Sequence, residues 1–340
     1  MIKRQSAKTT YQKIASEAGV SIATISRILT GASKVKTETR QRVLETMSRY
    51  GYNIEEINEN TKKQNSGIIL FNIPSLENPF YSKIAEGAKA AALRYGYQLL
   101  INEDHINENT ISIIINLIEK MNAVGIITTN HIPQTVLTKL NNTLPLVQCC
   151  EYDTDLKIPY VSIDDIAATK TIMDYLISLG CQRIALINGP IKYKYARHRF
   201  QSYLNSLERA GITPDPKFII QLPDVNFNLA VSAVTQLLDS DLRPDAFFCA
   251  SDVFAAAVIK SCIRIGLGVP KDIMVVGFDN IEIASMINPT ITTINQPQYQ
   301  LGFSSCNLLL ELLNNPKASV RNVILETEFI VRESTSLLWD

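Results

Sequence analysis

Several features that mark other classes of protein are missing from this sequence. No run of 18 or more apolar residues occurs, although 46% of the 340 residues are hydrophobic, so no segment is long enough for a transmembrane helix. The first residues, MIKRQSAKTTYQK, carry charges with no apolar segment behind them. We therefore expect no secretory signal, no membrane association and a cytoplasmic location.

The usual patterns of metal-binding and catalytic residues are also missing. The six cysteines include one adjacent pair, Cys149 and Cys150, but no CxxC motif, so we expect buried, reduced thiols and no metal site. There is no GxGxxG motif after the first predicted strand, no P-loop, no HExxH and no GxSxG,. We therefore expect no catalytic residues, no enzyme activity and no cofactor.

The overall net charge of zero hides an uneven distribution. Residues 1–53 contain ten lysines and arginines against three glutamates, for a net charge of +7, and the remainder carries −7. A basic segment joined to an acidic body favours a polyanionic partner for the basic segment.

Residues 10–53 have the pattern of three short helices. Gly19 follows the first, at the left-handed position that ends many helices. Ser21 is the predicted N-cap of the second helix, and Thr37 that of the third, which ends before Gly51,. Two helices separated by a tight glycine turn are typical of a helix-turn-helix, whose second helix enters the DNA major groove.

The second predicted helix has an outward face that suits DNA. Its inward positions are Ile25, Ile28 and Leu29,. Ile22 and Ala23 then point outward, where they would expose apolar surface to water but could meet thymine methyl groups on DNA. The alternative is a three-helix module for protein binding whose basic surface arises by chance.

From residue 67 onward, short apolar runs alternate with helical patterns. Strands are predicted at 67–73, 97–102, 123–128, 145–150, 160–164, 183–188, 246–251 and 273–278, and helices at 80–95, 109–121, 166–179, 197–210, 227–239 and 252–265. Apolar strands that alternate with helices predict parallel sheets covered on both faces. The units are too many for one compact sheet, so we expect an α/β fold with two similar, doubly wound lobes.

Ligands of such sheets bind beyond the carboxyl ends of the strands. Asp252 comes directly before a predicted helix, so N-capping is favoured over ligand contact,. Asp279 has no helix to cap, and Arg199 is either a solvated side chain or a ligand donor. The other polar or aromatic candidates near strand ends are Asn72, Ser75, Asn78, Phe80, Asp164 and Ser251.

Residues 10–53 and 67–335 together resemble the LacI/GalR family of bacterial transcription regulators. The segments that carry the resemblance are IASEAGVSIATISRILTG, VKTETRQRVLETMSRYGY, IPSLENPFY, RIALINGP, VPKDIMVVGFDN and TTINQP, in family order. The resemblance implies a helix-turn-helix head on a body similar to periplasmic sugar-binding proteins. It also implies a repressor that binds a pseudo-palindromic operator as a homodimer and is controlled by a small molecule, often a sugar, between the lobes.

The resemblance also assigns roles to positions of this sequence. It implies a DNA-binding domain at 1–53, a linker at 54–66 and an effector-binding and dimerisation domain at 67–340. The lobes would comprise 67–162 with 295–325, and 163–294 with 326–340. Implied base contacts are Ile22, Ala23 and Arg27; implied phosphate contacts are Thr10, Ser21, Thr24, Ser26, Lys34 and Thr39; implied effector contacts are Asn72, Ser75, Phe80, Thr129, Arg199, Ser251, Asp279 and Gln296.

The linker departs from the family pattern. Ile54 and Glu55 stand where the family commonly has Pro-Asn, and Thr61 stands where it has a leucine that enters the minor groove. The abundance of Asn, Glu, Lys and Thr predicts a disordered linker. In the alternative, Ile57 takes the role of the leucine.

Two other classes remain as rival hypotheses. A periplasmic-type binding protein is disfavoured by the absence of a signal and by the basic first 53 residues. An enzyme of doubly wound fold is disfavoured by the absence of catalytic motifs.

Overall fold

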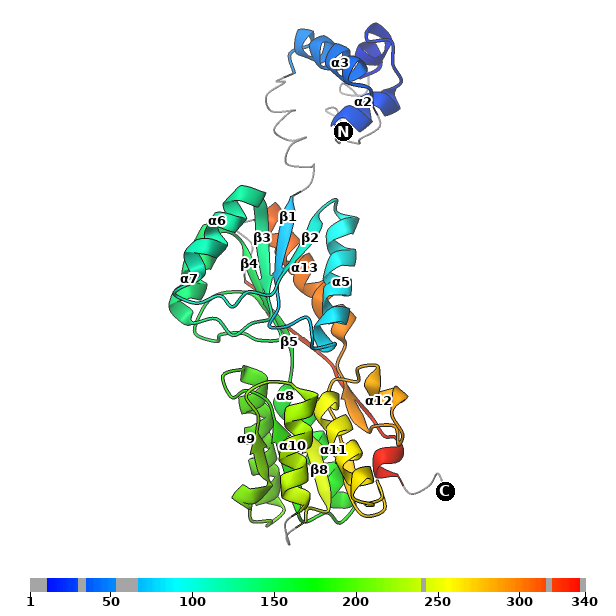
Figure 1. The fold of residues 1–340 in the computed structure, drawn as a ribbon. Helices are drawn as coiled ribbons and strands as arrows, with labels where there is room; N and C mark the ends of the chain where they lie inside the picture. The colour runs from blue at the N-terminus through cyan, green and yellow to red at the C-terminus, as the bar shows by residue number, and fades with distance from the viewer. Residues whose placement is uncertain (1–10, 30–34, 53–66, 240–242, 316–319, 337–340) are drawn as a thin grey trace.

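The computed structural model describes residues 11–29, 35–52, 67–239, 243–315 and 320–336 (Figure 1). Thr10, Lys34 and the linker at 54–66 lie outside these residues, and so does the side chain of Arg27.

The head consists of helix 11–17, α2 (Ile22–Leu29) and α3 (Thr37–Arg49). Gly19 has a φ angle of +66° and so adopts the left-handed conformation predicted for it, and Gly51, which follows the third helix, has a φ of +81°,. The backbone carbonyl of Ala18 accepts a hydrogen bond of 3.0 Å from Arg42 Nε, which fixes α3 against the end of the first helix. The buried core of the head contains Ile14, Ala15, Ala18, Ile25, Ile28, Val43 and Met47.

The predicted caps of the two later helices have different outcomes. Ser21 Oγ accepts a bond of 3.2 Å from the amide of Thr24, so Ser21 caps α2 as predicted,. The predicted cap at Thr37 is wrong: Thr37 is the first residue of α3, and Lys36 holds the cap position without a side-chain bond. A threonine inside the first turn has helical backbone angles and cannot act as the extended cap residue.

The first lobe is built on a six-stranded parallel sheet in the order β11-β5-β4-β3-β1-β2. Figure 1 shows α5 and α13 on one face of this sheet and α6 and α7 on the other. The strands are β1 (Ile68–Asn72), β2 (Gln98–Asn102), β3 (Ala123–Thr128), β4 (Leu146–Cys149), β5 (Tyr160–Ile163) and β11 (Val323–Leu325). The helices are α5 (Phe80–Arg94), α6 (Ile111–Met121), α7 (Gln134–Thr143) and α13 (Gln298–Asn314).

The second lobe has a four-stranded parallel sheet in the order β7-β6-β8-β9. Its strands are β6 (Ile184–Asn188), β7 (Ile219–Gln221), β8 (Ala246–Cys249) and β9 (Met274–Val276). Its helices are α8 (Asp165–Ser178), α9 (Lys194–Arg209), α10 (Phe227–Leu238), α11 (Asp252–Arg264) and the short α12 (Ile283–Met286), with 3₁₀ turns at Pro216–Phe218 and Glu333–Thr335. The pairs α8–α9 and α10–α11 each pack together.

Three segments join the two lobes. One leads from β5 directly into α8; the others run through β10 (Thr293–Asn295) and β12 (Glu328–Ile330), which pair antiparallel with each other. In Figure 1 these segments lie between the two sheets. The prediction of two doubly wound α/β lobes is therefore confirmed.

The prediction of individual elements in the body is right for each element that it names, but it is incomplete. Each of the eight predicted strands and six predicted body helices corresponds to an observed element. The prediction omits α7, α12 and α13 and the three-residue strands β7, β10, β11 and β12. Helix α13 is buried on several sides, so it lacks the clear polar face that makes helical periodicity visible in a sequence.

Candidate functional site

The outward face of α2 is the candidate DNA-binding surface. Ile22 is 43% exposed, and Ala23 and Ser26 are also exposed. Ser21 is exposed at the start of the helix, next to the half-buried Thr24, and the two hydroxyl oxygens lie 3.0 Å apart. The face therefore carries apolar and hydroxyl groups together, as an interface with thymine methyl groups and phosphates requires.

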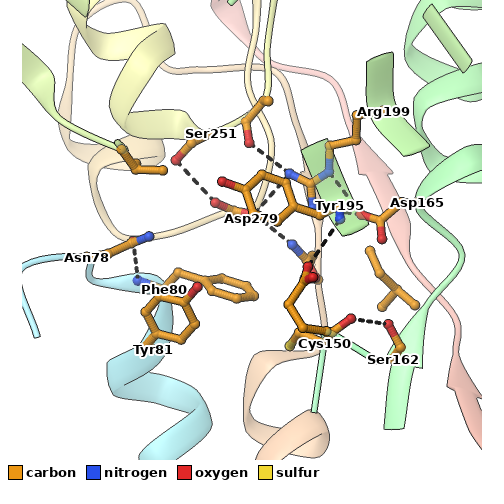
Figure 2. A pocket seen from close by; sticks show the side chains of 15 residues that line it. Asn78, Phe80, Tyr81, Cys150, Ser162, Asp165, Tyr195, Arg199, Ser251 and Asp279 are labelled. Carbon is orange, nitrogen blue, oxygen red and sulfur yellow. Dashed lines mark hydrogen bonds and ion pairs between the residues drawn. The ribbon is translucent and has the colours of Figure 1, made fainter. Parts of the chain in front are cut away.

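A second candidate site lies between the lobes, where residues from both surround a small cavity (Figure 2). Its volume is about 40 Å³, which holds one or two water molecules. Figure 2 shows Phe80 and Tyr81 of the first lobe facing Arg199 and Asp279 of the second. The lining residues are Asn78, Phe80, Tyr81, Cys150, Glu151, Ser162, Ile163, Asp165, Tyr195, Arg199, Val225, Ala250, Ser251, Asp279 and Gln296.

Arg199 lies in the second turn of α9 and is buried. Its Nε donates to Asp165 Oδ1 at 2.9 Å, and its Nη1 donates to the carbonyl of Ala250 at 2.8 Å. The guanidinium lies 3.4 Å from the centre of the Phe278 ring, so an aromatic face supports it. The interpretation of Arg199 as a solvated side chain is therefore wrong.

Asp279 follows β9 and faces Arg199. Its Oδ1 accepts a bond of 2.7 Å from Gln296 Nε2 and lies 3.8 Å from Arg199 Nη1, while its Oδ2 accepts a bond of 3.2 Å from Ser251 Oγ. Burial raises the pKa of Asp279 to about 7, although Arg199 and the two hydrogen bonds oppose the shift. A buried carboxyl that titrates near neutrality next to a guanidinium marks a candidate ligand site.

Asp252 does not have the capping role predicted for it. The N-cap of α11 is Ser251, whose Oγ accepts from the amide of Val253 at 3.4 Å, and Asp252 is the first helical residue. The buried Asp252 carboxylate accepts from the amide of Ile281 at 2.9 Å and from Thr293 Oγ1 at 2.6 Å. It therefore ties the loop that carries Asp279 to β10, and burial raises its pKa well above the ordinary value.

Three charged residues at the cleft are absent from the predicted site. Asp165 lies 2.6 Å from Lys194 Nζ as well as 2.9 Å from Arg199. Burial opposes its ionisation, but the two cations hold the pKa of Asp165 below its ordinary value. Glu151 follows β4 and reaches the start of α9 in the other lobe. A buried network of two cations and three carboxylates therefore occupies the cleft.

The structure brings five of the eight predicted effector contacts together and places the other three elsewhere. Asn72 and Thr129 are buried and do not line the cavity, and Thr129 Oγ1 donates to the carbonyl of Asn72 at 3.2 Å. Ser75 is in a turn, and its Oγ accepts from the amide of Glu77 at 3.1 Å. The five that line the cavity are Phe80, Arg199, Ser251, Asp279 and Gln296.

Of the other strand-end candidates, Asn78 lines the cavity, while Asp164 caps α8 by accepting from the amides of Ile166 and Ala167. Asp164 itself therefore has a structural role, and its neighbour Asp165 faces the cleft. In the part of the chain that the structure describes, no cluster of three or more His, Cys, Asp or Glu side chains could hold a metal ion. No helix among these residues is long and apolar enough to cross a bilayer.

A helix-turn-helix head combined with a two-lobed α/β body and a polar interlobe cleft defines a DNA-binding regulator with an effector-binding domain. Comparison with known proteins agrees. Residues 10–54 match the model of bacterial regulatory proteins of the lacI family, and residues 173–335 match the model of the periplasmic binding protein-like domain.

Similar proteins cover nearly the whole chain. The HTH-type transcriptional repressor CytR of Escherichia coli K12 is 33% identical over 338 residues, which are 99% of each protein. The solved structure of the transcriptional regulator CelR with cellobiose is 26% identical, with a TM-score of 0.72, and covers 95% of this chain and 99% of that one. The lac repressor dimer bound to operator is 25% identical, with a TM-score of 0.74, and covers 95% and 97%. The chain belongs to the lacI family of transcriptional regulators, and it is a sequence-specific DNA-binding regulator.

Proposed function

We propose that this regulator is a repressor whose operator affinity is set by a sugar or related polyol bound between the lobes. The observation that carries the proposal is the buried pair Arg199 and Asp279, a fork of N–H donors facing a carboxylate acceptor 3.8 Å away. A vicinal diol accepts from the first and donates to the second. Buried charges are costly without polar partners, and hydroxyl groups supply such partners.

The aromatic side chains of the cavity support the same class of effector. Phe80 and Tyr81 face the charged groups from the first lobe (Figure 2), and they offer flat surfaces to the apolar face of a sugar ring. Cellobiose occupies the related regulator CelR. The cavity of about 40 Å³ is much smaller than the roughly 300–1,000 Å³ of ordinary ligand pockets, so we expect the effector to enter as the lobes separate.

On the DNA side, α2 is the proposed recognition helix. Its exposed Ile22 and Ala23 would contact bases together with Arg27, in the major groove. The proposed phosphate contacts are Thr10, Ser21, Thr24, Ser26, Lys34 and Thr39,.

A homodimer on a pseudo-palindromic operator completes the proposal, as in the related lac repressor dimer. On the second lobe, Met286 is 75% exposed and Ile263 is 60% exposed, beside Phe227 and Ile283. An apolar surface of this kind suits a second copy of the chain. The proposed domain boundaries are those expected from the sequence. We propose that the protein acts in the cytoplasm, where the operator lies, and we assign it no catalytic step.

The effector proposal is tested by Asp279→Ala. We expect it to abolish stabilisation by the effector in a thermal-shift screen of sugars and purines, and to leave operator binding intact. Glu282→Ala, at an exposed residue near the same loop, is the matched control and should respond as the wild type does. A nucleobase that stabilises the wild type and Asp279→Ala equally would refute the sugar assignment.

The DNA proposal is tested by two head variants. Arg27→Ala should weaken operator binding by roughly 1–3 kcal/mol if the arginine contacts a guanine. Lys34→Ala should weaken binding to all sequences alike and lower the salt slope by about one unit. If both variants bind the operator as tightly as the wild type does, the assignment of α2 as the recognition helix is wrong.

A further inference from the structure

The N-terminus of α9 is occupied by a carboxylate from the other lobe. Glu151 Oε2 accepts from the amide of Lys194 at 2.6 Å, and Oε1 accepts from the amide of Tyr195 at 3.1 Å. Glu151 is 5% exposed. The free amides at the start of a 16-residue helix are the natural place for an anionic ligand in this cleft. The chain fills that place with its own anion.

The two buried cations of the cleft are also matched by carboxylates of the chain. Lys194 Nζ donates to Asp165 Oδ2 at 2.6 Å and to Ser162 Oγ at 3.2 Å, and it lies 4.7 Å from the centre of the Tyr152 ring. Arg199 lies between Asp165 and Asp279. The carboxylates of Asp165 and Glu151 already match the two cations, and the Asp279 carboxyl group lies beside Arg199, so no positive charge of this network is left for an anionic ligand.

The other cations at this end of α9 do not change the balance. Lys192 and Arg197 are exposed, and Arg197 Nη1 donates to the carbonyls of Ile191 and Lys192. Behind Asp279, Asp252 adds a further buried carboxyl group. The surroundings of the cavity are thus poor in available positive charge.

We propose that the effector carries no negative charge, and that Glu151 is the residue that excludes anions; this inference rests on the proposed function. A phosphate group adds a charge of about −1.5 to −2 at neutral pH. To reach the start of α9 it must displace Glu151, and elsewhere in the cleft it meets Asp165 and Asp279. Like charges at short distances in a poorly solvated site repel strongly. An unphosphorylated sugar is therefore accepted and its phosphate ester is rejected.

The test uses inorganic phosphate and the pair ribose and ribose 5-phosphate as probes of the full-length protein. Thermal unfolding is followed in each probe, against potassium chloride of equal ionic strength. We expect phosphate and ribose 5-phosphate to give the wild type no more stabilisation than the chloride does. Glu151→Ala frees the amides of Lys194 and Tyr195 at the helix N-terminus, so this variant should bind phosphate roughly tenfold more tightly than the wild type does.

Glu151→Gln keeps the size and one acceptor oxygen of the side chain without its charge, and should show part of the same gain. Glu208→Ala, at an exposed residue near the other end of α9, is the matched control and should behave as the wild type does. Because the basic head is present in every variant, its own affinity for phosphate cancels in these comparisons.

Two results would overturn the inference. One is a wild-type protein that binds ribose 5-phosphate more tightly than ribose, with the difference lost in Arg199→Met. The other is a pair of folded Glu151 variants that gain no affinity for phosphate. The proposed function is tested independently of this inference. If no sugar or polyol releases the operator, the polyol assignment is wrong. The phosphate measurements on the Glu151 variants still decide the role of that carboxylate.

Discussion

Replacing Asp279 by asparagine should make the effector-free protein more stable at neutral and alkaline pH. The amide has nearly the same shape as the carboxyl group. Its oxygen can accept from Gln296 at the Oδ1 position, and its NH₂ group can donate to Ser251 Oγ at the Oδ2 position, where hydrogen bonds of 2.7 and 3.2 Å are now made,. The substitution therefore removes the titration and preserves the local packing.

The size of the effect follows from the pKa. Burial raises the pKa of Asp279 from its ordinary value of 3.8 to about 7, a difference worth about 4 kcal/mol at 1.36 kcal/mol per unit. The folded state holds the proton more tightly than the unfolded state does. The stability due to this proton is fully present below a pH of about 4 and is lost as the pH rises through about 7. The asparagine variant does not lose it.

Urea denaturation of both proteins between about pH 5 and about pH 8 measures this difference. Relative to the wild type, Asp279→Asn should gain stability by up to about 1.4 kcal/mol for each pH unit until the pH reaches about 7. Glu151 and Asp252, whose pKa values are also raised, are present in both proteins and largely cancel. Glu208→Gln serves as the exposed control. A stability difference that is constant with pH, or that changes in the opposite sense, would refute the reasoning.

Three further substitutions test the packing, the linker and the head. A Cβ atom on Gly302 would lie 1.8 Å from a carbonyl oxygen of α5, so Gly302→Ala should destabilise the body by about 1–3 kcal/mol in urea denaturation. Gly268→Ala is the control and should change the stability little, because its added atom meets only side-chain atoms at 3.3 Å or more. Equal stabilities of the two variants would contradict the close packing of α5 and α13. Thr61→Leu should tighten operator binding and increase bending in a circular-permutation assay, because leucine can enter the minor groove; unchanged binding and bending would count against this role. Glu17→Gln removes an exposed ion pair of 2.9 Å with Arg49 and should lower the stability of the head by less than about 1 kcal/mol in a thermal melt. A larger loss of stability would contradict the small contribution expected of this pair.

The elements that the sequence predicts well are those with a strong local pattern. Gly19 and Gly51 end helices in the left-handed conformation, which few other residues adopt at low cost,. Composition alone is enough to predict an apolar strand such as 246–251, although the observed strand ends two residues earlier, at Cys249. Helix α7, with the sequence QTVLTKLNNT, has many residues of low helix propensity and is held in place by tertiary packing.

The charged network of the cleft could be predicted only in part. Arg199 and Asp279 are recognisable because each stands in a motif of the family or at a strand end. Glu151 and Asp165 directly follow the predicted strands 145–150 and 160–164, a signal that the prediction did not use, whereas Lys194 carries no such local mark. The partners of all three lie at least 29 residues away in the sequence. Their contacts exist only once both lobes are folded and adjacent, so sequence reasoning could not bring them together.

The contacts of Asp279 connect the candidate effector site to the segment between the lobes. Gln296 donates to its side chain and Gln298 Nε2 donates to its backbone carbonyl at 2.6 Å. Gln296 directly follows β10, and Gln298 is the first residue of α13, which packs closely on α5 in the first lobe. A ligand hydroxyl that replaces Gln296 at the carboxylate therefore acts on the joining segment as well as on the cavity. We infer that the same hydrogen bonds that would recognise an effector also help to set the angle between the lobes, since both depend on one short stretch of chain.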